Sequence, residues 1–192
     1  MKSNGVNRLK QNKDILLVIL VTTGFLLLAF IMKQVTGIPG WTALDFTVAG
    51  IMWFGAGLAY GLVTPKRKDL IYRIAVALAA ATGLLLFWSN LAVGLIGSED
   101  EPANLMYFGV LVVAFIGSVI SRFEPQGLAV AMWVTAGAQA LTVVIALVAG
   151  WQHLPESSVV EIIGVNVFFV LLWVASALLY RQAAKREMIN IS

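Results

Sequence analysis

Six long apolar segments divide this chain, and they constrain its fold more than any other feature. A helix needs about 20 apolar residues to cross the roughly 30 Å hydrocarbon core of a bilayer. Because the connections are short, consecutive helices are expected to be antiparallel. The sequence therefore predicts an all-α polytopic membrane protein, a six-helix transmembrane bundle with short loops, whose helices cover residues 15–32, 43–63, 70–96, 104–121, 127–150 and 159–180.

The composition agrees with this class of protein. Hydrophobic residues make up 60% of the chain and charged residues 12%, whereas a soluble domain has about 25% charged residues. No hydrophilic run is long enough to form a separate soluble domain. We therefore expect a basic N-terminal arm over 1–14, one transmembrane domain over 15–181 and a C-terminal tail over 182–192.

The basic residues indicate how the chain is threaded. Of the 13 Lys and Arg residues, all except Lys33 lie in or beside the N-terminal arm, the second connection, the fourth connection or the tail. The positive-inside rule then predicts that both termini are cytoplasmic. Because this topology already explains the basic charge, we do not expect nucleic acid as a partner.

The first segment also has some features of a signal peptide. Its apolar region is longer than the usual region of about 7–15 residues, and no Ala-x-Ala cleavage site follows it. We expect it to be an uncleaved helix.

The three helices expected to start at the outer face share one pattern, a hydroxyl residue followed three positions later by an acid. In such a capping box the hydroxyl accepts from a backbone N–H, and the acid reaches back to the cap residue. In the middle pair, Asp100 is an alternative cap that would suit Pro102 better. The predicted helix caps are Thr42 with Asp45, Ser98 with Glu101, and Ser158 with Glu161.

Three further outer acids are not needed for capping. Glu99, Asp100 and Glu156 would give the outer face a negative potential, so they are candidates for a loop that attracts cations. The alternative is a solvated loop. A metal site needs three or four convergent ligands; the chain has one histidine and no cysteine, so we expect no metal and no cofactor.

Polar side chains inside predicted spans are the other candidate residues. Asn90, Gln139 and Asn166 either line a polar path or hydrogen-bond between helices. Gln139 follows Ala131 and Thr135 at helical spacing, beside a face of small residues, which favours helix bridging. No ionisable residue occupies a mid-membrane position, which argues against a proton relay.

Small residues recur at helical spacing, as in Gly117-x-x-x-Ser121. Such faces allow close helix packing, either within the bundle, with a second copy or with another membrane protein. The sequence contains no HExxH, GxSxG or phosphate-binding glycine loop. We therefore expect a protein that is not an enzyme, with the lipid bilayer as its surroundings.

The stretch "GSEDEPANLMYFGV" followed by "SRFEPQGLAVAM" resembles a pattern in small bacterial multi-pass inner-membrane proteins that have no assigned function. The resemblance covers about residues 84–140. It implies a bacterial cytoplasmic (inner) membrane and carries no site chemistry.

These patterns favour an accessory, assembly or complex-forming membrane component without catalytic chemistry of its own. The alternative is a channel or transporter for a cation or small neutral solute that enters from the acidic outer face. The two differ in whether the three amides converge on a water-filled path or point into helix contacts.

Overall fold

The computed structural model describes residues 69–191, and 20, 23–24, 27, 31, 47–50, 53–54 and 57 of the preceding part. The chain divides into two compact units, Met1–Lys68 and Asp69–Ser192. The described residues of the first unit are helical. Most of the two predicted segments 15–32 and 43–63 lies outside the described residues, as do the predicted caps Thr42 and Asp45.

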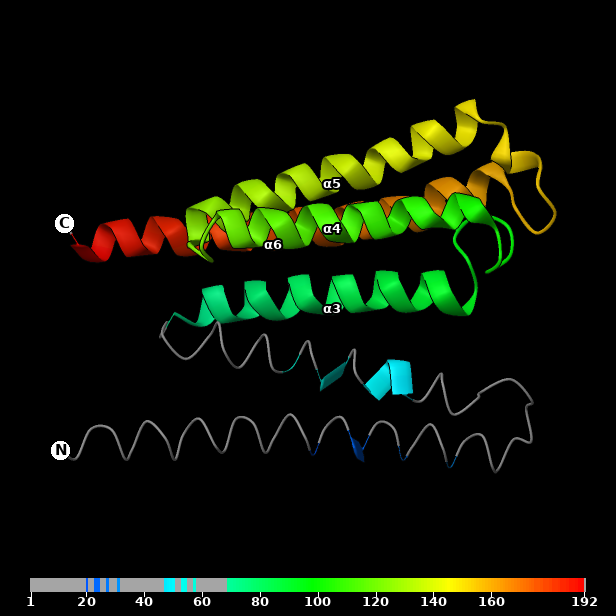
Figure 1. The fold of residues 1–192 in the computed structure, drawn as a ribbon. Helices are drawn as coiled ribbons and strands as arrows, with labels where there is room; N and C mark the ends of the chain where they lie inside the picture. Colours follow the sequence, from blue (N-terminus) through cyan, green and yellow to red (C-terminus); the bar gives the residue numbers. More distant parts are fainter. Residues whose placement is uncertain are drawn as a thin grey trace. The chain divides into compact units, whose positions relative to one another are not determined.

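The second unit contains four long helices that run back and forth (Figure 1). Each is long and apolar enough to cross a membrane, α4 together with the short helix before it. No strand occurs among the described residues. The elements are α3 (Leu70–Ala92), η1 (Pro102–Asn104), α4 (Leu105–Ile120), α5 (Pro125–Val148), η2 (Trp151–His153) and α6 (Val159–Ile191).

The ends of these helices follow from local chemistry. The Asp69 side chain accepts a 2.9 Å hydrogen bond from the Ile71 backbone N–H and so caps α3. Pro125 occupies the first turn of α5, where its missing N–H is not needed. Beyond the other end of α5, Gly150 has φ +77°, a left-handed conformation that favours glycine.

Helices α4 and α5 approach each other closely where small residues meet. Helix α6 packs against α5 and α3, and α4 packs against α5. A Cβ atom added to Gly117 would lie 2.8 Å from the Ala131 Cβ, and one added to Gly127 would lie 2.5 Å from the Ser121 Cβ. Gly117 and Ser121 thus lie on a close crossing of α4 and α5, as the small-residue spacing predicts.

The second unit exposes apolar side chains and buries most of its uncharged polar ones within a largely apolar core. Large hydrophobic side chains are widely exposed, including Phe115 at 69% and Val148 at 84%. In contrast, Thr135, Gln139 and Asn166 are fully buried. A surface so rich in large apolar side chains is unusual for a soluble domain, and it suits helices that face lipid.

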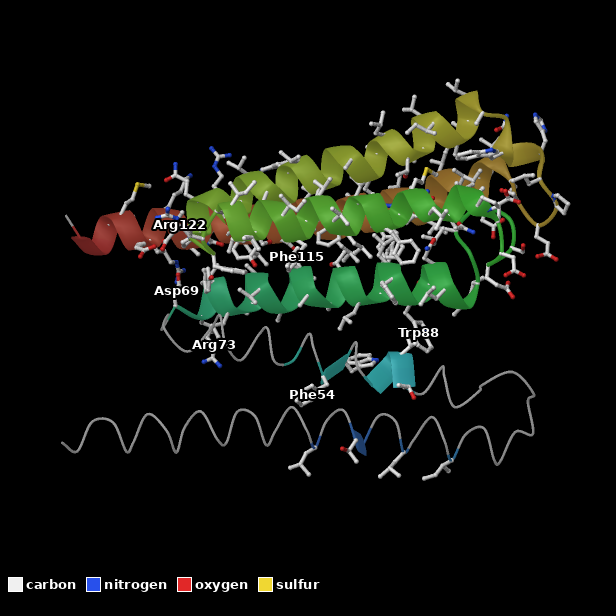
Figure 2. All side chains as sticks on the ribbon, viewed as in Figure 1. Phe54, Asp69, Arg73, Trp88, Phe115 and Arg122 are labelled. Atoms are coloured by element: carbon white, nitrogen blue, oxygen red, sulfur yellow. The ribbon has the colours of Figure 1, made fainter. Side chains whose placement is uncertain are left out.

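Charged side chains gather at the two ends of the second unit (Figure 2). One end carries the loop from α3 to η1 and the loop from α5 to α6, with exposed Glu99, Asp100 and Glu156. The opposite end carries the α4–α5 turn and the end of α6. It holds every Lys and Arg of the described second unit, namely Arg73, Arg122, Arg181, Lys185 and Arg186.

Candidate functional site

A hydrogen-bonded cluster of amides and hydroxyls lies in the interior of the second unit. Gln139 of α5 donates from Nε2 to Asn166 Oδ1 of α6 over 2.7 Å. Asn166 in turn donates from Nδ2 to the Tyr107 hydroxyl of α4 over 3.0 Å and to the Ile162 carbonyl over 2.8 Å. The Thr142 hydroxyl lies 2.9 Å from Asn166 Oδ1. These contacts, which we call the Asn166 cluster, join three helices.

The Ile162 carbonyl fixes the orientation of both amides. A backbone carbonyl can only accept a hydrogen bond, so the atom of Asn166 that faces it must be the nitrogen. Asn166 Oδ1 must then face Gln139, and it requires the Gln139 nitrogen there as donor. The sequence-predicted residues Gln139 and Asn166 are thus brought together, and they bridge helices as the spacing of Gln139 indicates.

Two amide oxygens of the predicted site residues are buried and have no hydrogen-bond partner among the described residues. One is Gln139 Oε1, on a side chain that is 0% exposed. The other is Oδ1 of Asn90 in α3, whose side chain is 3% exposed. The third predicted amide therefore lies in the interior, outside the hydrogen bonds of the Asn166 cluster.

Asn104 was not predicted as a site residue, yet it organises the end of the unit that carries the acids. Its Oδ1 accepts from the backbone N–H groups of Leu95 and Ile96, each over 3.0 Å. Its Nδ2 donates to the carbonyls of Ile96 over 3.1 Å and Ser98 over 2.8 Å. One buried side chain thus holds the loop between α3 and η1. The signal in the sequence was a lone amide directly before an apolar segment.

The predicted capping box of Ser98 and Glu101 is wrong. The residue before η1 is Glu101, and no side chain caps that helix, which also excludes Asp100 as the cap. The Ser98 backbone carbonyl accepts from Glu101 N over 3.1 Å and from Asn104 Nδ2. Because Asn104 draws this carbonyl inward, the segment forms a folded loop instead of the first turn of a helix.

The start of α6 agrees with its predicted pattern in one of the two bonds of a capping box. The Ser158 hydroxyl oxygen accepts from the Glu161 backbone N–H over 3.2 Å. Glu161 also lies in the first turn of the helix, where a carboxylate interacts favourably with the helix dipole.

The candidate cation-attracting acids lie on two loops that meet. A Cβ atom added to Gly97 would lie 3.7 Å from the Pro155 carbonyl oxygen. Glu99 and Asp100 on one loop and Glu156 on the other are exposed. Among the described residues, no group of three or more His, Cys, Asp or Glu side chains could hold a metal ion. The three acids therefore form an exposed negative surface.

Comparisons of the chain with protein-family models, curated proteins and solved structures found no match. The resemblance of residues 84–140 to bacterial multi-pass proteins stays a prediction.

Proposed function

We propose that this chain is a six-helix protein of the bacterial cytoplasmic membrane, with both termini inside, and that it acts as an accessory, assembly or complex-forming component without catalytic chemistry of its own. The apolar outer surface and the separation of basic from acidic ends support this placement. Its partner would be a second copy or another membrane protein.

One observation carries the proposal, the Asn166 cluster. Asn166 uses both of its N–H groups and its carbonyl oxygen on protein partners. Amides that lined a permeation path would instead offer these groups to water and solute. The interior polar groups thus contribute mainly to holding α4, α5 and α6 together, which suits a structural component.

The test combines a mass measurement with a flux assay. The protein is extracted from its own membrane in a mild detergent, and native mass spectrometry measures its assembly. We expect a fixed stoichiometry with a second copy or a partner protein. The purified protein in liposomes should pass monovalent cations and small neutral solutes no faster than empty liposomes do.

A channel or transporter is the second candidate, and the unpartnered buried oxygens of Gln139 and Asn90 favour it. The exposed acids at one end would mark its entrance. The discriminating variant is Gln139→Leu, with Thr82→Val as control, because the one hydrogen bond of the Thr82 hydroxyl within the described part of the chain goes to the Leu78 carbonyl of its own helix. The result that favours transport is a monomeric parent protein that passes solute, with the flux lost in Gln139→Leu and kept in Thr82→Val at similar thermal stability. That result would replace the accessory role with a transport role.

A further inference from the structure

Gln139 has hydrogen-bonding capacity that the fold does not use. Its Nε2 is committed to Asn166, and the chain of contacts back to the Ile162 carbonyl prevents the amide from turning over. The atom left without a partner is therefore a carbonyl oxygen, in a side chain fully removed from solvent. A buried acceptor of this kind costs free energy unless a donor reaches it.

Asn90 offers a second acceptor at a similar level, on α3, which packs against α6 and α4. A Cβ atom added to Gly83 of α3 would lie 3.7 Å from the Trp173 ring of α6, which sets the register of these antiparallel helices. Asn90 lies seven residues after Gly83, and Asn166 lies seven residues before Trp173. Both steps run in the same direction over about 10 Å. Asn90 is thus within about one turn of the level of the Asn166 cluster.

The chemistry around these acceptors is neutral. The buried polar groups of the described part are amides, hydroxyls and the Trp173 indole N–H, with no carboxylate, Lys or Arg among them. A cation placed there would have no countercharge, and burying an unpaired charge is far more costly than burying a dipole. Two carbonyl oxygens are also too few to replace the hydration shell of a metal cation, which takes about six or more oxygen ligands, so an uncharged donor fits them better.

We propose that Gln139 Oε1 and Asn90 Oδ1 mark a site in the bundle interior, beside the Asn166 cluster, that binds an uncharged O–H or N–H donor. The inference does not rest on the proposed accessory role. Two sources share this chemistry, an internal water molecule and a small alcohol or amide solute. They differ in size, so separate measurements distinguish them.

Radiolytic hydroxyl labelling tests the water source in the intact protein in nanodiscs. Tyr107 is 0% exposed but belongs to the Asn166 cluster, so an internal water beside it would lead to its oxidation. Phe169, which is 2% exposed and makes an aromatic contact with Phe168, is the buried control. We expect Tyr107 to be oxidised several-fold faster than Phe169, and this excess to disappear in Gln139→Leu and in Asn90→Leu.

Thermal unfolding in acetamide or glycerol tests the solute source. Both additives also act on the bulk solvent, so the quantity measured is the change in Tm of the parent minus that of Gln139→Leu. We expect a bound solute to raise the parent Tm by at least a degree more than that of the variant. Thr82→Val should behave as the parent does, and Asn90→Leu repeats the test if Gln139→Leu does not fold.

Loss of the Tyr107 excess in both amide variants supports the site with water as its ligand, and a differential Tm shift supports it with a solute. If Tyr107 is oxidised no faster than Phe169 and the Tm shifts are equal, the site does not exist. Equal Tyr107 oxidation in the parent and both amide variants, with no differential Tm shift, also overturns the proposal, because the amides would then not hold the donor.

Discussion

At the scale of single residues, two buried asparagines perform different structural tasks with the same functional group. Asn104 uses two acceptor contacts and two N–H groups on the backbone of one loop. Asn166 of α6 forms hydrogen bonds to side chains of α5 and α4. The amide suits both tasks because it carries donors and acceptors side by side, which no other uncharged side chain of this size offers.

Removing Asn104 should therefore unfold the loop between α3 and η1. In Asn104→Ala several buried backbone groups lose their partner, and we expect a loss on the order of 3 kcal/mol in the free energy of unfolding. Thermal unfolding in detergent measures it, with Gln182→Ala as control because Gln182 is exposed. Equal stability of the two variants would contradict the role assigned to Asn104.

The two serines of the predicted caps form a matched pair. Ser158 accepts through its hydroxyl oxygen, whereas Ser98 accepts through its backbone carbonyl, which alanine retains. We expect Ser158→Ala to cost about 1 kcal/mol and Ser98→Ala to cost close to nothing. Urea titration of both variants checks the ranking, and a larger loss at Ser98 would restore the capping box there.

The sequence predicted some of these residues because their surroundings repeat with the period of a helix. Gln139 continues the Ala131 and Thr135 row, and this row is buried. Tyr107 and Thr142 were missed as members of the cluster, since an aromatic or threonine inside an apolar segment looks like ordinary packing. Their partners lie 59 and 24 residues away along the chain, a distance that periodicity within one helix does not report.

At the scale of elements, hydropathy located the helices of the second unit but misplaced two of their ends. Helix α3 stops at Ala92, short of the expected residue 96, because Asn104 holds the backbone of apolar Leu95 and Ile96 in a loop. Helix α6 continues to Ile191, beyond the expected residue 180. Hydropathy shows where a helix stops being apolar, which differs from where it stops being a helix.

The crossing of α4 and α5 gives an element-scale prediction. Gly117→Ala would place a methyl group 2.8 Å from the Ala131 Cβ, so the helices must separate, at a cost of about 1–3 kcal/mol. Gly109 lies in the same helix with no atom within 4 Å of an added Cβ. Gly109→Ala should be neutral or stabilising by up to about 1 kcal/mol. Thermal unfolding of the two variants in parallel compares them, and similar losses would show that close packing at Gly117 is unimportant.

At the scale of the whole molecule, the second unit combines an apolar exterior with an uneven distribution of charge between its two ends. The helices bring the exposed acids of two separate loops to one end, and they bring Arg73 of α3, Arg122 of the α4–α5 turn and Arg181 of α6 to the other. The sequence predicted this division from loop charges alone, because short antiparallel connections leave each loop only two choices of side.

The orientation is testable with single cysteines, since the chain has none of its own. Asp100→Cys and Gln182→Cys replace exposed residues at opposite ends of the second unit. With an impermeant thiol reagent on intact cells, Asp100→Cys should be labelled, and Gln182→Cys should be labelled only after lysis. The opposite result would reverse the proposed topology.

Helix α6 is 33 residues long, or about 50 Å at 1.5 Å per residue, whereas the hydrocarbon core of a bilayer is roughly 30 Å thick. A helix of this length would extend beyond the hydrocarbon core of the membrane as one continuous rod. A domain fused to its end through a helical linker would be held at a fixed distance from the membrane and in a fixed orientation about the helix axis. Each alanine inserted into that linker would turn the domain by about 100° about the helix axis and move it about 1.5 Å further from the membrane. The orientation of a fused domain could therefore be adjusted one residue at a time.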